Sequence, residues 1–91
     1  AEEGFVSVYA VVETTTGTIL AGPHIQARGV AEDDSVFEEI LPDVTEALSA
    51  ALETGKADAY SLQQVMRRTL GRWIGRRLRR RPMIVPVVIE A

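Results

Sequence analysis

Apolar residues follow three strand-like patterns along the 91-residue chain. Residues 4–13 and 83–90 are dense in valine and other residues that favour strands. Residues 18–30 form a less regular run, which Pro23 and Gly29 interrupt. We therefore expect a hairpin of the first two runs, with a bulge or a bend in its second strand, and a third strand near the end of the sequence.

A helix is predicted over residues 35–54, because apolar side chains recur there at three- and four-residue spacing. Ser35 and Glu38 form a capping-box pattern at its start, and Gly55 is expected at its C-terminal end. Pro42 lies inside the pattern. It either kinks the helix or stands in the first turn of a main body that follows a separate short turn.

A second helix is predicted over residues 61–80, starting from the capping-box pair Ser61 and Gln64. Its apolar positions share one face, and its arginines lie mainly on the other. Gly71 and Gly75 each cost roughly 1 kcal/mol of helix propensity relative to alanine. We expect them to allow a close approach by the sheet or by a neighbouring subunit.

The order strand, strand, helix, helix, strand predicts a small α+β domain that spans residues 1–91. In this two-layer sandwich a three-stranded sheet is covered on one face by both helices. Pro86 should leave one ladder donor missing, which indicates an edge strand or a bulge.

The first and third strands are apolar at consecutive positions, whereas a sheet that is wet on one side alternates apolar and polar residues. Either a second copy or a neighbouring domain covers the other face, or the sheet is more enclosed. Lysine at Val8 or Val87 would test the first idea, although the pattern does not tell which alternate residues form that face.

The charge is divided unevenly between the two parts of the chain, although the net charge is only −3. Residues 1–58 hold 12 acidic residues against Arg28 and Lys56, a net charge of −10. Residues 59–91 hold eight arginines against Glu90, a net charge of +7. Such a division can attract an anionic partner, or it can be satisfied within the molecule or across a subunit interface.

The arginines are the side chains best suited to a direct binding function, because guanidinium groups match phosphate geometry and release counterions from RNA. A platform for stacking bases is not evident, since Trp73 falls on the apolar face of its helix. The candidate RNA or interface contacts are Arg67, Arg68, Arg72, Arg76, Arg77, Arg79 and Arg80.

Catalytic chemistry has little support in these residues. His24 is the only histidine and cysteine is absent, so neither a clustered metal site nor a nucleophile pair is expected. The acidic pairs 33–34 and 38–39 are explained by helix capping and the helix dipole. We expect no catalytic, cofactor-binding or metal-binding residue in the chain. No apolar run approaches the roughly 20 residues that span a membrane.

Several segments together resemble the C-terminal domain of ribonuclease J in its actinobacterial form. The matching segments are Gly22-Pro23, Ile25, Arg28-Gly29, nearly all of Arg80 to Glu90, the strand from Gly4 to Val8, and the helix from Gln63 to Trp73. Their order and spacing carry the resemblance, which covers almost the whole chain. Ala27 departs from the family pattern, which usually has serine there, so no hydrogen bond of that hydroxyl is assumed.

The resemblance implies an accessory domain that supports the oligomer assembly and the activity of a nuclease of the metallo-β-lactamase and β-CASP class. Such hydrolases are zinc-dependent 5′ exonucleases and endonucleases that process and degrade RNA, and their zinc motifs lie in an N-terminal catalytic region. It thus implies three partners, namely that region, further copies in a dimer or tetramer, and RNA, all in the cytoplasm.

An auxiliary RNA-binding module that uses the arginines of the second helix is the alternative function. Whether the chain counts as an enzyme stays open: the parent protein is expected to be a ribonuclease, while this segment alone carries no catalytic site.

Overall fold

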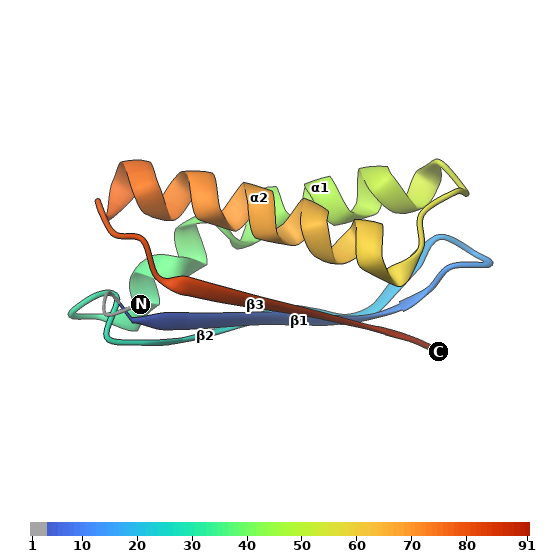
Figure 1. The fold of residues 1–91 in the computed structure, drawn as a ribbon. Coiled ribbons are helices and arrows are strands. Elements are labelled where there is room, and N and C mark those ends of the chain that lie inside the picture. Colours follow the sequence, from blue (N-terminus) through green and yellow to red (C-terminus); the bar gives the residue numbers. More distant parts are fainter. Residues whose placement is uncertain (1–3) are drawn as a thin grey trace.

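A three-stranded sheet with both helices on one of its faces makes up the computed structural model, which describes residues 4–91 (Figure 1). The strands are β1 (Phe5–Glu13), β2 (Thr18–Arg28) and β3 (Met83–Glu90). They lie in the order β2-β1-β3, with β1 antiparallel to β2 and parallel to β3. The predicted α+β class is confirmed, and the central place of β1 and the mixed strand directions are new.

The helical part consists of a 3-10 helix, η1 (Asp34–Glu39), and the α-helices α1 (Leu41–Glu53) and α2 (Ala59–Arg77). Of the two alternatives for residues 35–54, the structure shows the second: the main helix α1 follows a separate short turn, η1, and the two are not one kinked helix. Pro42 stands in the first turn of α1, where a missing N–H breaks no helical bond. Asp33 takes the capping role expected of Ser35: its carboxylate accepts a hydrogen bond from the Ser35 N–H at 3.0 Å.

Helix α2 begins two residues earlier than expected, at Ala59, with Asp58 as its N-cap. The Ser61 N–H donates to Asp58 Oδ1 at 2.8 Å, and the Asp58 N–H donates to Ser61 Oγ at 3.0 Å. Ser61 thus belongs to the capping box, but it is the third residue of α2, and Asp58 is the N-cap. The helix ends at Arg77 rather than near residue 80, because Arg79 has a φ of 57°, which does not continue a right-handed helix.

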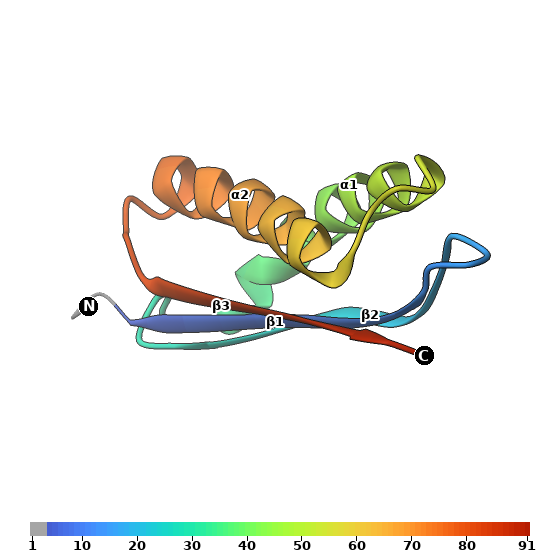
Figure 2. The same ribbon diagram turned by 45° about the vertical axis from the view of Figure 1, so that its right-hand side comes forward.

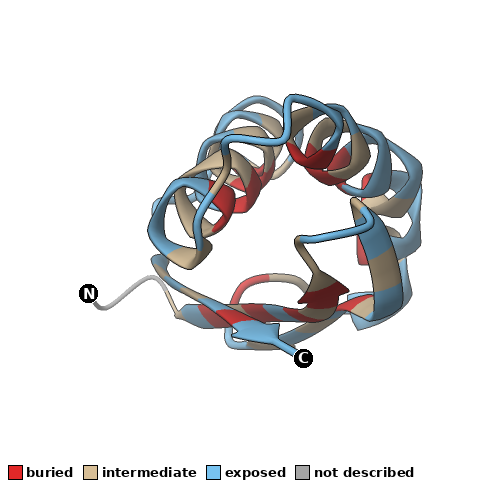
Figure 3. Cartoon of the chain, turned by 90° about the vertical axis from the view of Figure 1, so that its right-hand side faces the viewer, coloured by how far each residue is buried: buried red, intermediate tan, exposed pale blue. Residues whose placement is uncertain are grey.

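The core lies between the sheet and the helices, where the buried positions of both layers face one another (Figure 3). Helix α2 lies over β3, and α1 lies over β2 (Figure 2). A Cβ atom on Gly71 would be 3.4 Å from Ile84 Cδ1, so this glycine allows α2 to approach the sheet closely. A Cβ atom on Gly75 would meet nothing within 4 Å, so packing within the described chain does not require that glycine.

Strand β2 is irregular, as Pro23 and Gly29 led us to expect. Its pairing with β1 shifts register on both sides of Val11, and the Gly22–Pro23 peptide bond is cis. A Cβ atom on Gly22 would lie 2.7 Å from the Tyr9 carbonyl oxygen, and its φ is 84°. Only glycine can lie this close to the β1 backbone and adopt this φ without strain.

Candidate functional site

The sheet face that points away from the helices is apolar, and we call it the outer sheet face. Successive side chains of a strand point to opposite faces, and Val6, Val8, Ala10 and Val12 of β1 are completely buried against the helices. The alternate residues of β1 and their partners in β3 therefore point outward. The large apolar side chains on the outer sheet face are Phe5, Tyr9, Val11, Met83, Val85, Val87 and Ile89.

All of these side chains except the half-buried Val11 are exposed, with Met83 at 59%, Ile89 at 52% and Val87 at 40% of their full accessible surface. Six of the eight large apolar residues that are exposed among residues 4–91 belong to this face. Scattered exposed apolar residues are ordinary on a protein surface, whereas a contiguous patch marks an interaction surface.

Strand β2 adds a polar strip along one side of the same face. His24, Gln26 and Arg28 are the register partners of outward-facing residues of β1. The rings of Tyr9 and His24 lie 5.0 Å apart. Arg28 stands at one end of the sheet, and Glu13 stands at the other. The outer sheet face is thus apolar over β1 and β3, polar over β2 from His24 to Arg28, and of opposite charge at its two ends.

The middle of the free edge of β3 offers no free donor for further strand pairing. The Met83 N–H donates to the Gly4 carbonyl at 3.1 Å, and the Ala91 N–H donates to the Val12 carbonyl at 2.9 Å. Bonding groups alternate along a strand, so the groups of Pro86 and Val88 point toward the free edge. Pro86 has no N–H, and the Val88 N–H donates to Gln63 Oε1 at 3.2 Å.

Pro86 therefore marks an edge strand, as expected, yet no donor is missing from the ladder with β1. The hydrogen bond of Gln63 to β3 could not be predicted from its sequence position, because only the placement of α2 over β3 brings its amide to that edge.

The arginines predicted as contact residues separate into three groups in the structure. Three of them line one hollow: Arg72 and Arg76 from α2, and Arg80 from the segment that joins α2 to β3. Arg77 instead makes a bidentate ion pair with Glu39, with both N–O distances at 3.1 Å. That hydrogen-bonded carboxylate raises the pKa of Arg77. The exposed residues Arg67, Arg68 and Arg79 lie outside the hollow.

We call that hollow the arginine cleft. It has a volume of about 570 Å³. Its lining residues are Gly71, Arg72, Gly75, Arg76, Arg80, Arg81, Pro82 and Ile84. No carboxylate of residues 4–91 lines it, and Arg81 is a lining residue that was not among the predicted contacts. Within residues 4–91, none of Arg72, Arg76 and Arg80 forms a hydrogen bond or ion pair.

Arg72 and Arg76 also border the groove between α1 and α2, together with Asp43 and Glu46 of α1. No ion pair crosses this groove within the described chain. The network between arginines and the acidic first helix, which the sequence allowed, is thus represented in residues 4–91 by the ion pair between Arg77 and Glu39, the last residue of η1.

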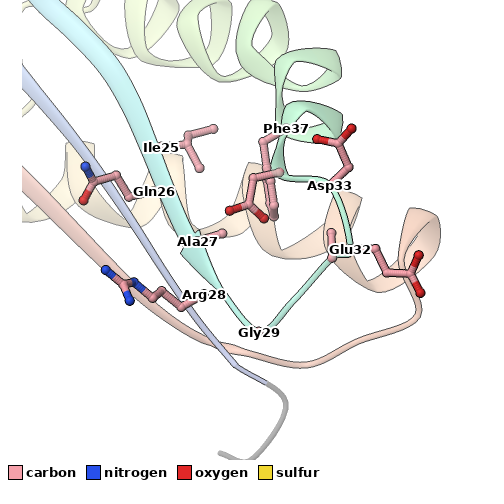
Figure 4. Close-up of a pocket in the computed structure, with 10 residues that line it drawn as sticks. Ile25, Gln26, Ala27, Arg28, Gly29, Glu32, Asp33 and Phe37 are labelled. Atoms are coloured by element: carbon pink, nitrogen blue, oxygen red, sulfur yellow. The ribbon is translucent and has the colours of Figure 1, made fainter.

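A polar hollow beside the end of β2 holds several acidic residues (Figure 4). Arg28 points to one side of β2, and Phe37, which belongs to η1, lies on the other side of that strand (Figure 4). Glu32 and Asp33 point away from each other (Figure 4). The Ser35 backbone N–H and then the Ser35 side chain lower the pKa of Asp33 through its capping bonds. In residues 4–91 no group of three or more His, Cys, Asp or Glu side chains could hold a metal ion. None of the helices described is long and apolar enough to cross a membrane.

The family model of the ribonuclease J C-terminal domain matches residues 1–91. The chain is 42% identical over 87 residues to ribonuclease J of Mycobacterium tuberculosis, an alignment that covers 96% of the chain and 16% of that protein. It is 33% identical over 92 residues to ribonuclease J of Corynebacterium glutamicum, covering 97% of the chain and 12% of that protein. Ribonuclease J 2 of Staphylococcus aureus is 31% identical over 93 residues, with 99% and 17% covered.

The fold and its surface define a small α+β sandwich domain with one exposed apolar sheet face. The chain belongs to the family of ribonuclease J C-terminal domains, which confirms the resemblance seen in its sequence. It spans about one sixth or less of the length of these curated relatives.

Proposed function

We propose that this chain assembles the subunits of a ribonuclease J by stacking its outer sheet face on the same face of a second copy. The observation that carries the proposal is the contiguous row of exposed apolar side chains on β1 and β3, which ends in Met83 and Ile89. Burial of such side chains against a matching sheet is favourable, and two stacked sheets pack about 10 Å apart.

The edge of β3 also supports contact through the face, because two central positions of that edge cannot donate to an added strand. Addition of a strand to β3 would need free N–H groups at its outer edge, where Pro86 has none and Val88 already donates to Gln63. Apart from the hydroxyl groups of Ser7 and Tyr9, the side chains that β1 and β3 place between the two ends of this face need no hydrogen-bond partner, so most of the face can be covered without leaving a polar group unsatisfied.

The surface pattern favours one arrangement of the two copies. A two-fold axis that runs across the strands, in the plane between the sheets, stacks β3 on β3 and β2 on β2 of the partner subunit. Apolar strands then meet apolar strands, and Arg28 comes to the end that carries Glu13 of the partner subunit. An axis along the strands would instead place the apolar β3 against the polar strip of β2. Contact through this face alone joins two copies into a dimer, and a tetramer would need a second contact surface.

The assembled domain would support activity by holding catalytic regions together. In this proposal those regions lie in the N-terminal part of the same protein, contain the zinc, and carry out the exonuclease and endonuclease reactions on RNA in the cytoplasm. The test is the molar mass of the full-length ribonuclease, measured by light scattering, with and without the segment from Ala1 onward. Deletion should lower the number of subunits, whereas an unchanged number would reject the assembly function.

A second candidate function is auxiliary RNA binding, and the arginine cleft favours it. Within residues 4–91, Arg72, Arg76 and Arg80 form no ion pair, and no acidic residue of that range lines the cleft. Its positive charge is thus available to an anionic partner from outside.

A further inference from the structure

We propose that the arginine cleft binds the phosphate backbone of single-stranded RNA without reading its bases; this inference rests on the second candidate function. Arg72 and Arg76 are one helical turn apart, which corresponds to about 6 Å along the axis of α2. That distance is close to the separation of consecutive phosphates in an extended strand. Arg80 reaches the same cleft from the segment after the helix, so three guanidinium groups can contact one strand.

The position of Gly75 is an argument for a ligand in the cleft. A glycine inside a helix costs roughly 1 kcal/mol relative to alanine. Packing explains the glycine at position 71, because Ile84 lies close to Gly71. No such contact explains Gly75, since nothing lies within 4 Å of its Cβ position. The glycine leaves bare backbone in the lining of the arginine cleft, and bare backbone permits a close approach by a ligand.

The lining residues decide which part of the RNA is recognised. Guanidinium groups pair bidentately with phosphate oxygens. No aromatic side chain lines the cleft, and the ring of Trp73 packs against Phe37 with a centroid distance of 5.4 Å. Base stacking is therefore not available in this cleft, and binding should depend on phosphate charge rather than on sequence.

The chain offers a matched pair of variants for a test. The cleft variant replaces Arg72, Arg76 and Arg80 by glutamine. The control variant replaces Arg67, Arg68 and Arg79 by glutamine, which removes the same charge from exposed positions outside the cleft. Binding of a fluorescein-labelled oligouridine to the 91-residue chain is measured by anisotropy between about 50 and 200 mM NaCl. Light scattering of each variant gives its subunit number.

The parent chain should lose affinity steeply as salt rises. Each phosphate contact on a single strand contributes about 0.7 to the slope of log K against log salt, so the cleft variant should reduce the magnitude of the slope by about 2. Its affinity at the lowest salt should fall at least about tenfold, while the control variant keeps most of the affinity and both variants keep the parent subunit number.

Three results would overturn the proposal. Equal losses in the two variants would show general charge attraction rather than a cleft. Displacement of the RNA by polyglutamate of equal charge, with equal potency, would assign the cleft to an acidic protein segment. A lower subunit number in the cleft variant would assign its arginines to an interface. The assembly proposal is tested separately, because Val87→Lys should change the subunit number and leave the salt slope per subunit unchanged.

Discussion

Lysine at Val87 should break the proposed dimer while leaving the domain folded. Val87 lies on the outer sheet face and is 40% exposed in the single chain. Complete burial of a valine contributes about 1.5 to 3 kcal/mol, so burial of the remaining surface contributes about 0.6 to 1.2 kcal/mol per subunit. A two-fold interface contains the position twice, and lysine also places a charge among apolar side chains.

The combined loss is at least about 2 kcal/mol, which corresponds to a dissociation constant raised about 30-fold or more. Sedimentation equilibrium of the 91-residue chain over a range of concentrations measures this change directly. Because Val87 is exposed in the subunit, its replacement should lower the free energy of unfolding by only about 1 kcal/mol or less.

Two control variants separate assembly from folding. Val8 is completely buried against the helices, so Val8→Lys should unfold the domain, with a loss of more than about 4 kcal/mol. Tyr60 is 69% exposed near the start of α2 and is not part of the outer sheet face, so Tyr60→Lys should leave the dissociation constant unchanged. The reasoning is refuted if Val87→Lys and Tyr60→Lys give the same dissociation constant as the parent chain while both remain folded by circular dichroism.

Three further predictions follow from particular residues. Gly75→Ala should stabilise the domain by about 0.5 to 1 kcal/mol in urea unfolding, while Gly22→Ala should destabilise it; a stability loss in Gly75→Ala would show that the position is crowded. The Ser61 backbone N–H and then its side chain lower the pKa of Asp58, so this cap stabilises above about pH 4 and is lost as pH falls through the lowered pKa. Asp58→Asn keeps a capping oxygen but does not titrate, so the midpoint temperature of thermal unfolding should depend less on pH in the range where the cap is lost. A pH dependence equal to that of the parent chain would contradict this role of Asp58. Arg28→Glu and Glu13→Arg should each weaken the dimer a few-fold and restore it when combined, whereas additive losses would argue against the axis across the strands.

The strands and helices could be predicted because their apolar periodicities are clear, but their exact ends depended on competing signals. Asp58 and Ser61 are both good capping residues, and either could begin α2. The structure selects Asp58 because Ser61 can then return a hydrogen bond to it. At the other end, the left-handed conformation of Arg79 stops the helix before Pro82, and no local pattern predicts that conformation for arginine.

The candidate site was only partly predictable for a related reason. Both faces of β1 are apolar, so alternation could not show that Val8 points inward while Tyr9 points outward. The arginines could be found in the sequence, but their grouping needed the fold. Arg77 meets Glu39 because η1 lies beside the end of α2, and Arg80 joins Arg72 because the chain turns sharply into β3.

The most direct test of assembly through the outer sheet face is the molar mass of the 91-residue chain itself as a function of concentration, measured by light scattering. The subunit mass is 10.0 kDa. We expect the mass to rise to twice this value with increasing concentration, and Val87→Lys to shift the rise to higher concentration. A mass that stays at 10.0 kDa up to millimolar concentration would contradict the account.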